Sequence, residues 1–498
     1  MAASTQSAIR HPQSLLALLL LALLAIRIGS LGLYPLGDTT EARYGEVARL
    51  MLESGNWITP QSEPWVPFWA KPPLSFWAQA ATMAVFGVNE FGARFSSVLF
   101  AILVGVLLWH FARRAEPGRP LHEAWLALVI LATMPLFFLI AGTVMTDMAL
   151  LVCTSAAMAG FWFALEGQRR WGYVFFVALG FGLLAKGPVI LALVGLPLFL
   201  WWVAGPSRVE RVQMIRQRLP WLTGALLMLA IALPWYVVAE LRTPGFLDYF
   251  LRGEHLHRFL KPNWQGDLYG SAHPEPRGKV WLFLFYAACT WLPVWLASLR
   301  VWSRTNPPAA PTSLDHYLVT WTLSTPIFFT LAGNTIWSYV LPSLPAISIW
   351  LARRVSGGAL HVKRLTALTA ALGTAAMAVL YFVWLPGADV SNDRSTRDMI
   401  RDARTLISPH PHALLVMIHA KPHSADFYSV REVVALTHDD ALWIMRRGEP
   451  AAFMATDEHL NERLMDGWLI RVLRERAQLV GRYGKYTLYF HPPSPPPR

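Results

Sequence analysis

The chain has 498 residues, of which 54% are hydrophobic and only 15% are charged, and it contains 23 tryptophans. This composition, together with apolar runs long enough to cross a bilayer, is typical of a polytopic membrane protein and excludes an ordinary soluble domain. The formal net charge is +12, but the basic residues are scattered through short loops between the apolar runs. That pattern indicates membrane orientation and argues against nucleic-acid binding.

Apolar runs recur along residues 1–386 and predict the membrane-spanning helices. They lie near 14–34, 92–112, 122–141, 146–166, 172–185, 188–203, 219–241, 278–299, 316–333, 339–352 and 365–385. The runs give about 11 transmembrane helices, and about 12 or 13 are alternatives, because the two crossings within 172–203 are short. With the N-terminus inside, every short basic loop falls on the same face, as the positive-inside rule requires.

Two long segments, 35–91 and 242–277, fall on the opposite, outer face together with everything after residue 386. Residues 41–54 have one apolar face and one charged face, which is typical of an amphipathic helix lying on the membrane. Residues 73–88 are also apolar, but counting them as a span would reverse the basic loops that follow. We therefore expect both segments to form juxtamembrane helices on the outer side.

The segment after residue 386 has the composition of a small folded domain. Short strands are predicted at 413–420, 431–437 and 450–456, helices at 439–448 and 457–477, and a closing hairpin at 479–491. These elements predict an α/β domain over 387–491, followed by a proline-rich tail at 492–498 that need not be ordered. We interpret this domain as a structural or acceptor-recruiting unit.

Polar side chains recur at the predicted outer ends of the spans, far apart in the sequence. A charge beside lipid is costly unless it is paired or lines a wet cavity, so we expect these residues to converge on one site. The candidates are Asp38, Glu41, Arg43, Tyr44, Lys71, Asp147, Lys186, His255, Arg258 and Tyr339. The alternative is that they are the solvated faces of interfacial helices and anchors for lipid headgroups.

In chain order these residues belong to motifs that resemble the bacterial ArnT-like glycosyltransferases of the GT-C superfamily, with protein O-mannosyltransferases as more distant relatives. The motifs are Asp38…Glu41-Ala42-Arg43-Tyr44, Lys71-Pro72-Pro73, Asp147, Lys186-Gly187, Glu254-His255…Arg258 and Ser338-Tyr339-Val340-Leu341-Pro342. The resemblance covers residues 14 to about 355, and the outer C-terminal domain also fits it.

The resemblance implies a GT-C fold in the bacterial inner membrane, with an active site that faces the periplasm. It implies transfer of a sugar from a polyprenyl carrier such as undecaprenyl phosphate to lipid A or another glycolipid, with aminoarabinose transfer as the leading case. The partners it implies are therefore the lipid-linked donor, the glycolipid acceptor and the membrane lipids.

A polyprenyl phosphate leaving group requires cations that bind it and stabilise the charge developing as the glycosidic bond breaks. Arg43, Lys71 and Arg258 are the predicted cations, and the Tyr339 hydroxyl can donate a further hydrogen bond. Tyr44, Lys186 and His255 complete the predicted substrate contacts.

The predicted catalytic residues are the carboxylates Asp38, Glu41 and Asp147. A hydroxyl acceptor needs a base, and the resemblance points to an acid of the first outer loop and to Asp147. Relatives commonly carry adjacent acids in a D-E-x-R-Y motif, whereas this chain has Thr40 before Glu41. The choice between Asp38 and Glu41 therefore stays open. A phosphate acceptor is already ionised and needs no strong base.

No cofactor is predicted to be required. A divalent metal near His255 is an alternative, but the acid that commonly precedes Lys-Pro-Pro in relatives is Ala70 here. The alternative functions are a protein O-mannosyltransferase-like enzyme and a lipid flippase or transporter. Transporters usually carry internal repeats and ionisable groups at mid-membrane, and neither pattern is evident in the sequence.

Overall fold

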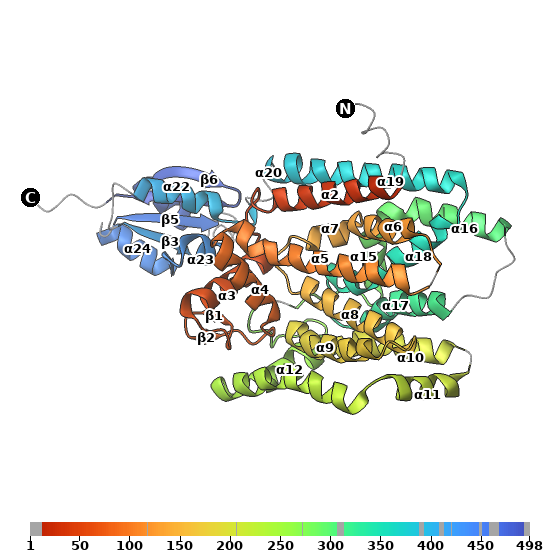
Figure 1. The fold of residues 1–498 in the computed structure, drawn as a ribbon. Helices are drawn as coiled ribbons and strands as arrows, with labels where there is room; N and C mark the ends of the chain where they lie inside the picture. The colour runs from red at the N-terminus through yellow and green to blue at the C-terminus, as the bar shows by residue number, and fades with distance from the viewer. Residues whose placement is uncertain are drawn as a thin grey trace, which may run out of the picture.

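The protein is a bundle of long helices with a smaller α/β unit at one end (Figure 1). The computed structural model describes residues 12–116, 118–205, 207–270, 272–305, 313–387, 393–407, 413–419, 421–447, 451–457 and 468–492.

Every predicted apolar run carries helical structure. The bundle contains α2 (Pro12–Ser30), α5 (Glu90–Arg114), α6 (Leu121–Ala132), α7 (Pro135–Ile140), α8 (Asp147–Leu165), α9 (Arg169–Lys186), α10 (Val189–Ala204), α12 (Trp221–Arg242), α15 (Lys279–Ala288), η2 (Cys289–Trp291), α16 (Leu292–Thr305), α17 (Ser313–Thr330), η3 (Trp337–Ser343), α18 (Leu344–Ser356), α19 (Leu360–Val379), η4 (Leu380–Trp384) and α20 (Leu385–Gly387). Within the described ranges, 6 helices are long and apolar enough to cross a membrane, and three apolar helices are shorter. The chain is a multi-pass membrane protein, as predicted.

The two ends of the bundle differ in charge and in structure. The basic helix α11 (Arg208–Arg218) lies at the end opposite the α/β unit, whereas segment 35–91 folds beside that unit (Figure 1). This segment forms α3 (Thr40–Ser54), the hairpin β1 (Gln61–Glu63) and β2 (Val66–Pro67), and α4 (Leu74–Phe86). The separation agrees with the predicted topology, in which basic loops share one face and long segments the other.

The second long segment between helices, 242–277, contains an uncommon element. It forms α13 (Phe246–Asp248), η1 (Tyr249–His257) and α14 (Arg258–Leu260), and η1 is a π-helix. π-Helical turns are rare and occur frequently at functional sites.

The C-terminal unit, residues 393–492, is built on a five-stranded sheet of order β4-β3-β5-β7-β6. Strands β3 (Leu414–Ile418), β4 (Val433–Leu436) and β5 (Ala452–Asp457) are parallel, and β7 (Tyr486–His491) pairs antiparallel with β5 and with β6 (Gln478–Tyr483). Helices α22 (Arg397–Ile407), α23 (His423–Ser429), α24 (His438–Arg447) and α26 (Trp468–Arg476) accompany the sheet. The predicted strands and hairpin are present. Part of the predicted helix, 458–467, and tail residues 493–498 lie outside the described residues.

Burial of charged residues in α3 argues against the alternative in which they are the solvated face of an interfacial helix. Its charged residues Glu46 and Arg49 are 1% and 3% exposed. Arg431 of the C-terminal unit pairs with Glu46 at 2.8 Å, and Arg49 pairs with the same carboxylate at 2.7 Å. The C-terminal unit covers the polar face of α3, so these charges contact protein rather than solvent.

Candidate active site

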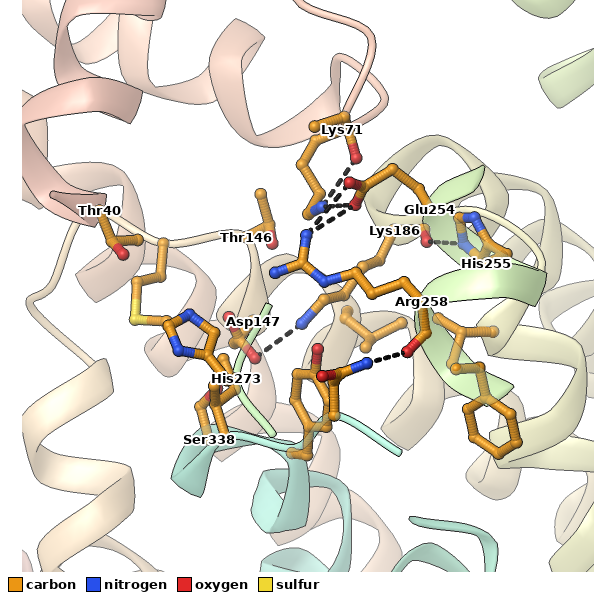
Figure 2. Close-up of a pocket in the computed structure, with 18 of the residues that line it drawn as sticks. Thr40, Lys71, Thr146, Asp147, Lys186, Glu254, His255, Arg258, His273 and Ser338 are labelled. Atoms are coloured by element: carbon orange, nitrogen blue, oxygen red, sulfur yellow. Dashed lines mark hydrogen bonds and ion pairs between the residues drawn. The ribbon is translucent and has the colours of Figure 1, made fainter. Parts of the chain in front are cut away.

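A cavity of about 610 Å³ opens where the outer segments meet the helix bundle. Eight of the ten residues selected from the sequence line it: Arg43, Tyr44, Lys71, Asp147, Lys186, His255, Arg258 and Tyr339. They come from α3, the segment before α4, the start of α8, the end of α9, the segment η1–α14 and η3. In Figure 2 the side chains of Lys71 and Arg258 point toward Glu254, and that of Lys186 points toward Asp147. The fold thus brings together residues that are distant in the sequence.

One wall of the cavity is a network of two carboxylates and two cations. Glu254 lies 2.9 Å from the Lys71 ammonium and 3.1 Å from Arg258, which also lies 3.0 Å from Asp267 (Figure 2). Burial raises the pKa of Glu254, but the charges of Lys71 and Arg258 outweigh it and lower this pKa to about 2. Glu254 is therefore ionised and holds both cations at the cavity.

Asn334 binds the backbone of the segment that carries Arg258. Its side-chain amide donates to the carbonyl oxygens of Arg258 at 2.6 Å and Lys261 at 2.7 Å. These hydrogen bonds connect the turn after η1 to the loop between α17 and η3. They restrict the backbone from which the Arg258 side chain extends.

A second ion pair in the cavity joins Asp147 and Lys186. The Lys186 ammonium is 2.9 Å from the Asp147 carboxylate and 5.1 Å from the centre of the Tyr339 ring. Asp147 begins α8, where the helix dipole favours an anion, and Lys186 ends α9. Gly187 follows at φ +77°, a conformation that favours glycine, and any Cβ there would meet the Phe250 ring at 2.5 Å.

His255 lines the cavity, but both of its ring nitrogens face backbone carbonyls. Nδ1 is 2.8 Å from the Phe250 oxygen, and Nε2 is 3.1 Å from the Lys186 oxygen. Burial lowers the pKa of His255. The ring therefore joins η1 to the end of α9. Within the described ranges, no group of three or more His, Cys, Asp or Glu side chains is arranged to hold a metal ion, and Ala70, which precedes Lys71, also lines the cavity.

Arg43 differs from the other cavity cations. Its Nη1 donates to the Tyr269 carbonyl, and its guanidinium carbon lies 5.3 Å from the Tyr44 ring centre. Nε is buried without a hydrogen-bond partner, and within the described part of the chain no carboxylate lies within 4.0 Å of the guanidinium. Four cations, Arg43, Lys71, Lys186 and Arg258, and three carboxylates, Asp147, Glu254 and Asp267, line the cavity. The cavity lining therefore carries one positive charge in excess, that of Arg43.

Glu41 does not line the cavity, contrary to the expected convergence. Its carboxylate pairs with Arg94 of α5 at 2.8 Å and accepts from the backbone N–H groups of Val144 at 3.0 Å and Gly37 at 3.3 Å. Burial raises the pKa of Glu41, but the charge and hydrogen bonds of Arg94 outweigh it and lower this pKa. Glu41 therefore joins α3 to the loop that precedes it, to α5 and to the segment before α8.

Asp38 also points away from the cavity. Its carboxylate accepts from the backbone N–H of Ser424 at 2.9 Å and from the Ser424 hydroxyl, both in α23. Burial raises the pKa of Asp38 to about 6, although the hydrogen bonds from Ser424 lower it. The wall between the two acids is formed instead by Thr39 and Thr40. Of the three predicted catalytic carboxylates, Asp147 alone lines the cavity.

The sequence analysis did not select two lining residues, Asp267 and His273, or the arginine that pairs with Glu41. Asp267 and His273 lie in a loop without a recognisable motif, so nothing in the sequence marks them. Arg94 did carry a signal, because a cation inside the predicted span 92–112 needs a buried partner. It is 0% exposed and donates to the carbonyls of Leu31, Tyr34 and Pro35 as well as to Glu41.

Comparison with known proteins gives matches in sequence. A family model described as dolichyl-phosphate-mannose-protein mannosyltransferase matches residues 14–250. An undecaprenyl phosphate-α-4-amino-4-deoxy-L-arabinose arabinosyl transferase of Edwardsiella ictaluri is 28% identical over 70% of this chain and 61% of its own length. The protein of that name from Erwinia tasmaniensis is 27% identical over 72% of this chain and 63% of its own length. The chain thus spans less than two thirds of these relatives' length.

Solved structures match the fold. ArnT from Cupriavidus metallidurans bound to undecaprenyl phosphate gives a TM-score of 0.75 at 18% identity, with 95% of this chain and 97% of that chain covered. The archaeal oligosaccharyltransferase AglB from Archaeoglobus fulgidus gives 0.51 at 11% identity, with 95% and 74% covered. The sequence matches agree with the resemblance drawn from the sequence, and the solved structures show that this chain has the fold of ArnT and AglB.

Proposed function

We propose that the chain is a membrane glycosyltransferase that takes a sugar from a polyprenyl phosphate carrier, undecaprenyl phosphate being the named carrier of its relatives. The acceptor is lipid A or another glycolipid, and aminoarabinose is the leading sugar because the relatives' names specify it. The donor enters the cavity with its phosphate against Arg43, Lys71 and Arg258.

The observation that carries this proposal is the charge of the cavity. Lys71 and Arg258 are held in place by Glu254, and Arg43 adds a cation that no carboxylate of the described residues neutralises. A phosphate monoanion or dianion compensates that excess charge. In the transition state the leaving phosphate gains charge, and fixed cations stabilise it without reorganising.

The ion pair of Asp147 supports a phosphate rather than a hydroxyl as the nucleophile. A general base needs a carboxylate oxygen that can contact the acceptor hydroxyl, and one oxygen of Asp147 already lies 2.9 Å from the Lys186 ammonium. An acceptor phosphate is already ionised and needs no proton removed. Asp147 then balances charge and orients the sugar, with Lys186 and Tyr339 beside it.

The location that we propose is the bacterial inner membrane, with the cavity facing the periplasm. The basic helix α11 lies at the opposite end of the bundle from the cavity-bearing segments (Figure 1). Basic loops favour the cytoplasmic side, so the cavity opens away from it.

The test is a transfer assay with purified full-length protein in nanodiscs. An undecaprenyl phosphate-linked sugar is mixed with lipid A, and the lipids are analysed by mass spectrometry. We expect lipid A to gain the mass of the sugar residue and the carrier to return as undecaprenyl phosphate. Arg43→Ala should reduce the rate by about 100-fold or more, whereas Arg252→Ala, on the exposed side of η1, should leave it unchanged.

A second acceptor class follows from the family match. The mannosyltransferase model that covers residues 14–250 favours a protein acceptor. A serine- or threonine-containing peptide added to the same assay separates the two. Sugar on the peptide and none on lipid A would support the protein O-mannosyltransferase alternative. Movement of the donor lipid between leaflets with no covalent change would contradict both and support a flippase.

A further inference from the structure

Helix α23 of the C-terminal unit packs against α3, the helix that carries Arg43 into the cavity (Figure 1). The Phe427 ring belongs to the same apolar cluster as Tyr44 and Val47 of α3. The approach is close at Gly45, where an added Cβ would lie 3.4 Å from the Phe427 ring and 3.0 Å from Leu36. The two helices therefore meet directly beside the cavity wall.

Hydrogen bonds stabilise this helix–helix contact in the loop that precedes α3. Asp38 accepts from the Ser424 backbone and hydroxyl, so a carboxylate of the outer loop caps α23. The Leu36 N–H donates to the Tyr428 hydroxyl at 2.7 Å, and the Asp38 N–H donates to the Arg394 carbonyl at 2.7 Å. Two segments of the C-terminal unit, α23 and the residues before α22, thus bind the loop that leads into α3.

Arg431 of the C-terminal unit makes a second polar contact further along α3. Arg431 pairs with the buried Glu46 at 2.8 Å and donates to the Ser62 carbonyl at 3.1 Å. Thr40, Arg43 and Tyr44 line the cavity between the Asp38 and Glu46 contacts. The C-terminal unit therefore contacts α3 and its preceding loop on both sides of the turn that lines the cavity.

These two contacts, at Asp38 and at Glu46, matter most for the position of Arg43. Lys71, Lys186 and Arg258 are each held by a carboxylate of the cavity, whereas Arg43 is paired with none among the described residues. Among the described residues, its side chain donates one hydrogen bond, to the Tyr269 carbonyl, so the position of its guanidinium depends chiefly on the backbone of α3. Whatever fixes the position of α3 also fixes Arg43.

We propose that Ser424 and Arg431 are positioning residues of the transfer site: through Asp38 and Glu46 they hold α3 where Arg43 reaches the donor phosphate. The C-terminal unit thereby acts on the cavity without touching the substrate. This inference rests on the proposed function, because it assigns Arg43 to a lipid phosphate.

The test measures binding of undecaprenyl phosphate to the full-length protein in nanodiscs. We expect Arg43→Ala to raise the Kd by about 10- to 100-fold, and Ser424→Ala or Arg431→Ala to raise it by about 3- to 10-fold. Ser424→Thr retains the hydroxyl and should restore most of the affinity. Arg401→Ala, which removes a 67% exposed arginine paired with Asp398 and Asp402 of its own helix α22, is the matched control and should leave the Kd unchanged.

A double-mutant cycle separates positioning from general loss of structure. If Arg431 acts through Arg43, Arg431→Ala should weaken binding by less than about 2-fold once Arg43 is alanine. An equal loss in both backgrounds would overturn the inference. If Arg431→Ala fails to give folded protein, the same cycle is run with Ser424→Ala, whose side chain is smaller.

The outcomes also distinguish the inference from the proposed function. Weaker binding in Arg43→Ala, with wild-type affinity in Ser424→Ala and Arg431→Ala, would overturn the positioning role and leave the transferase proposal standing. Unchanged binding in Arg43→Ala would contradict the transferase proposal itself.

Discussion

Two buried carboxylates lie near the outer end of the bundle, and each is paired with an arginine. Glu254 faces the cavity and holds Lys71 and Arg258, with Asp267 sharing the second cation. Glu41 is closed off from the cavity and holds Arg94, whose other donors reach three backbone carbonyls. The Glu254 network leaves its cations within reach of a ligand, whereas the Glu41 network uses every contact to join helices.

The comparison teaches that charge beside the membrane has two separate uses in this protein. An arginine satisfied by carbonyls and a carboxylate is structural, because no donor is left for a substrate. A lysine and an arginine that share one carboxylate at an open wall keep donors free, as binding an anion requires. The predictions below contrast the two networks.

Arg94→Ala should have the largest effect on folding. It would leave Glu41 buried without its cation, and breaking a buried ion pair from one side costs about 3–5 kcal/mol of the free energy of unfolding. Thermal unfolding in detergent, followed by intrinsic fluorescence, measures the loss. The double variant Arg94→Met with Glu41→Gln should recover part of it. A stable Arg94→Ala protein that lacked only transfer activity would contradict the structural role.

Arg258→Ala should have the largest effect on transfer with the fold retained. Removing a preorganised cation from the leaving phosphate is expected to reduce kcat by about 100- to 1,000-fold. Arg252→Ala is the matched control, because Arg252 lies on the same π-helix but is 75% exposed and pairs with Asp248. Rates from the nanodisc assay and melting temperatures should be measured on the same samples. Equal rates for the two variants would place the phosphate elsewhere.

The Asp147–Lys186 pair should show coupled effects on transfer. Asp147→Asn and Lys186→Met each remove one member of an ion pair, and the double variant should lose less than the two single losses combined. The expected coupling is about 1–3 kcal/mol in the activation free energy, from the kcat values of the four proteins. Strict additivity would show that the two side chains act independently.

The smallest expected effect is a pH dependence at Asp38. Burial raises its pKa from 3.8 to about 6 in the folded protein, so its contribution to stability is complete below pH 3.8 and is lost as the pH rises through 6. Asp38→Asn should lack that decline. Melting temperatures of the two proteins across this range measure the difference. Parallel curves would mean that Asp38 does not titrate there.

The sequence predicted the spans and most of the cavity for a physical reason. Apolar runs must cross the bilayer, and polar groups at their ends must meet one another or water, so Lys71, Asp147 and Arg258 could be selected from position alone. The strands of the C-terminal unit followed from their short β-rich runs and turns.

The roles of Asp38 and Glu41 could not be separated in the same way. Their partners, Ser424 and Arg94, lie in distant parts of the chain, and no local spacing predicts such pairs. The substitution of Thr40 for the first acid of the motif was the available clue, because this position lines the cavity while Glu41 does not. The partner of Glu46 on α3 could not be predicted for a similar reason, since Arg431 follows hundreds of residues later.

The most direct test of the central claim is an experimental structure of the protein in nanodiscs with undecaprenyl phosphate bound. The account predicts phosphate oxygens within hydrogen-bond distance of Arg43, Lys71 and Arg258, with Glu41 still paired to Arg94. A phosphate bound outside this cavity, or one held by Arg94 with Arg43 turned away, would contradict it.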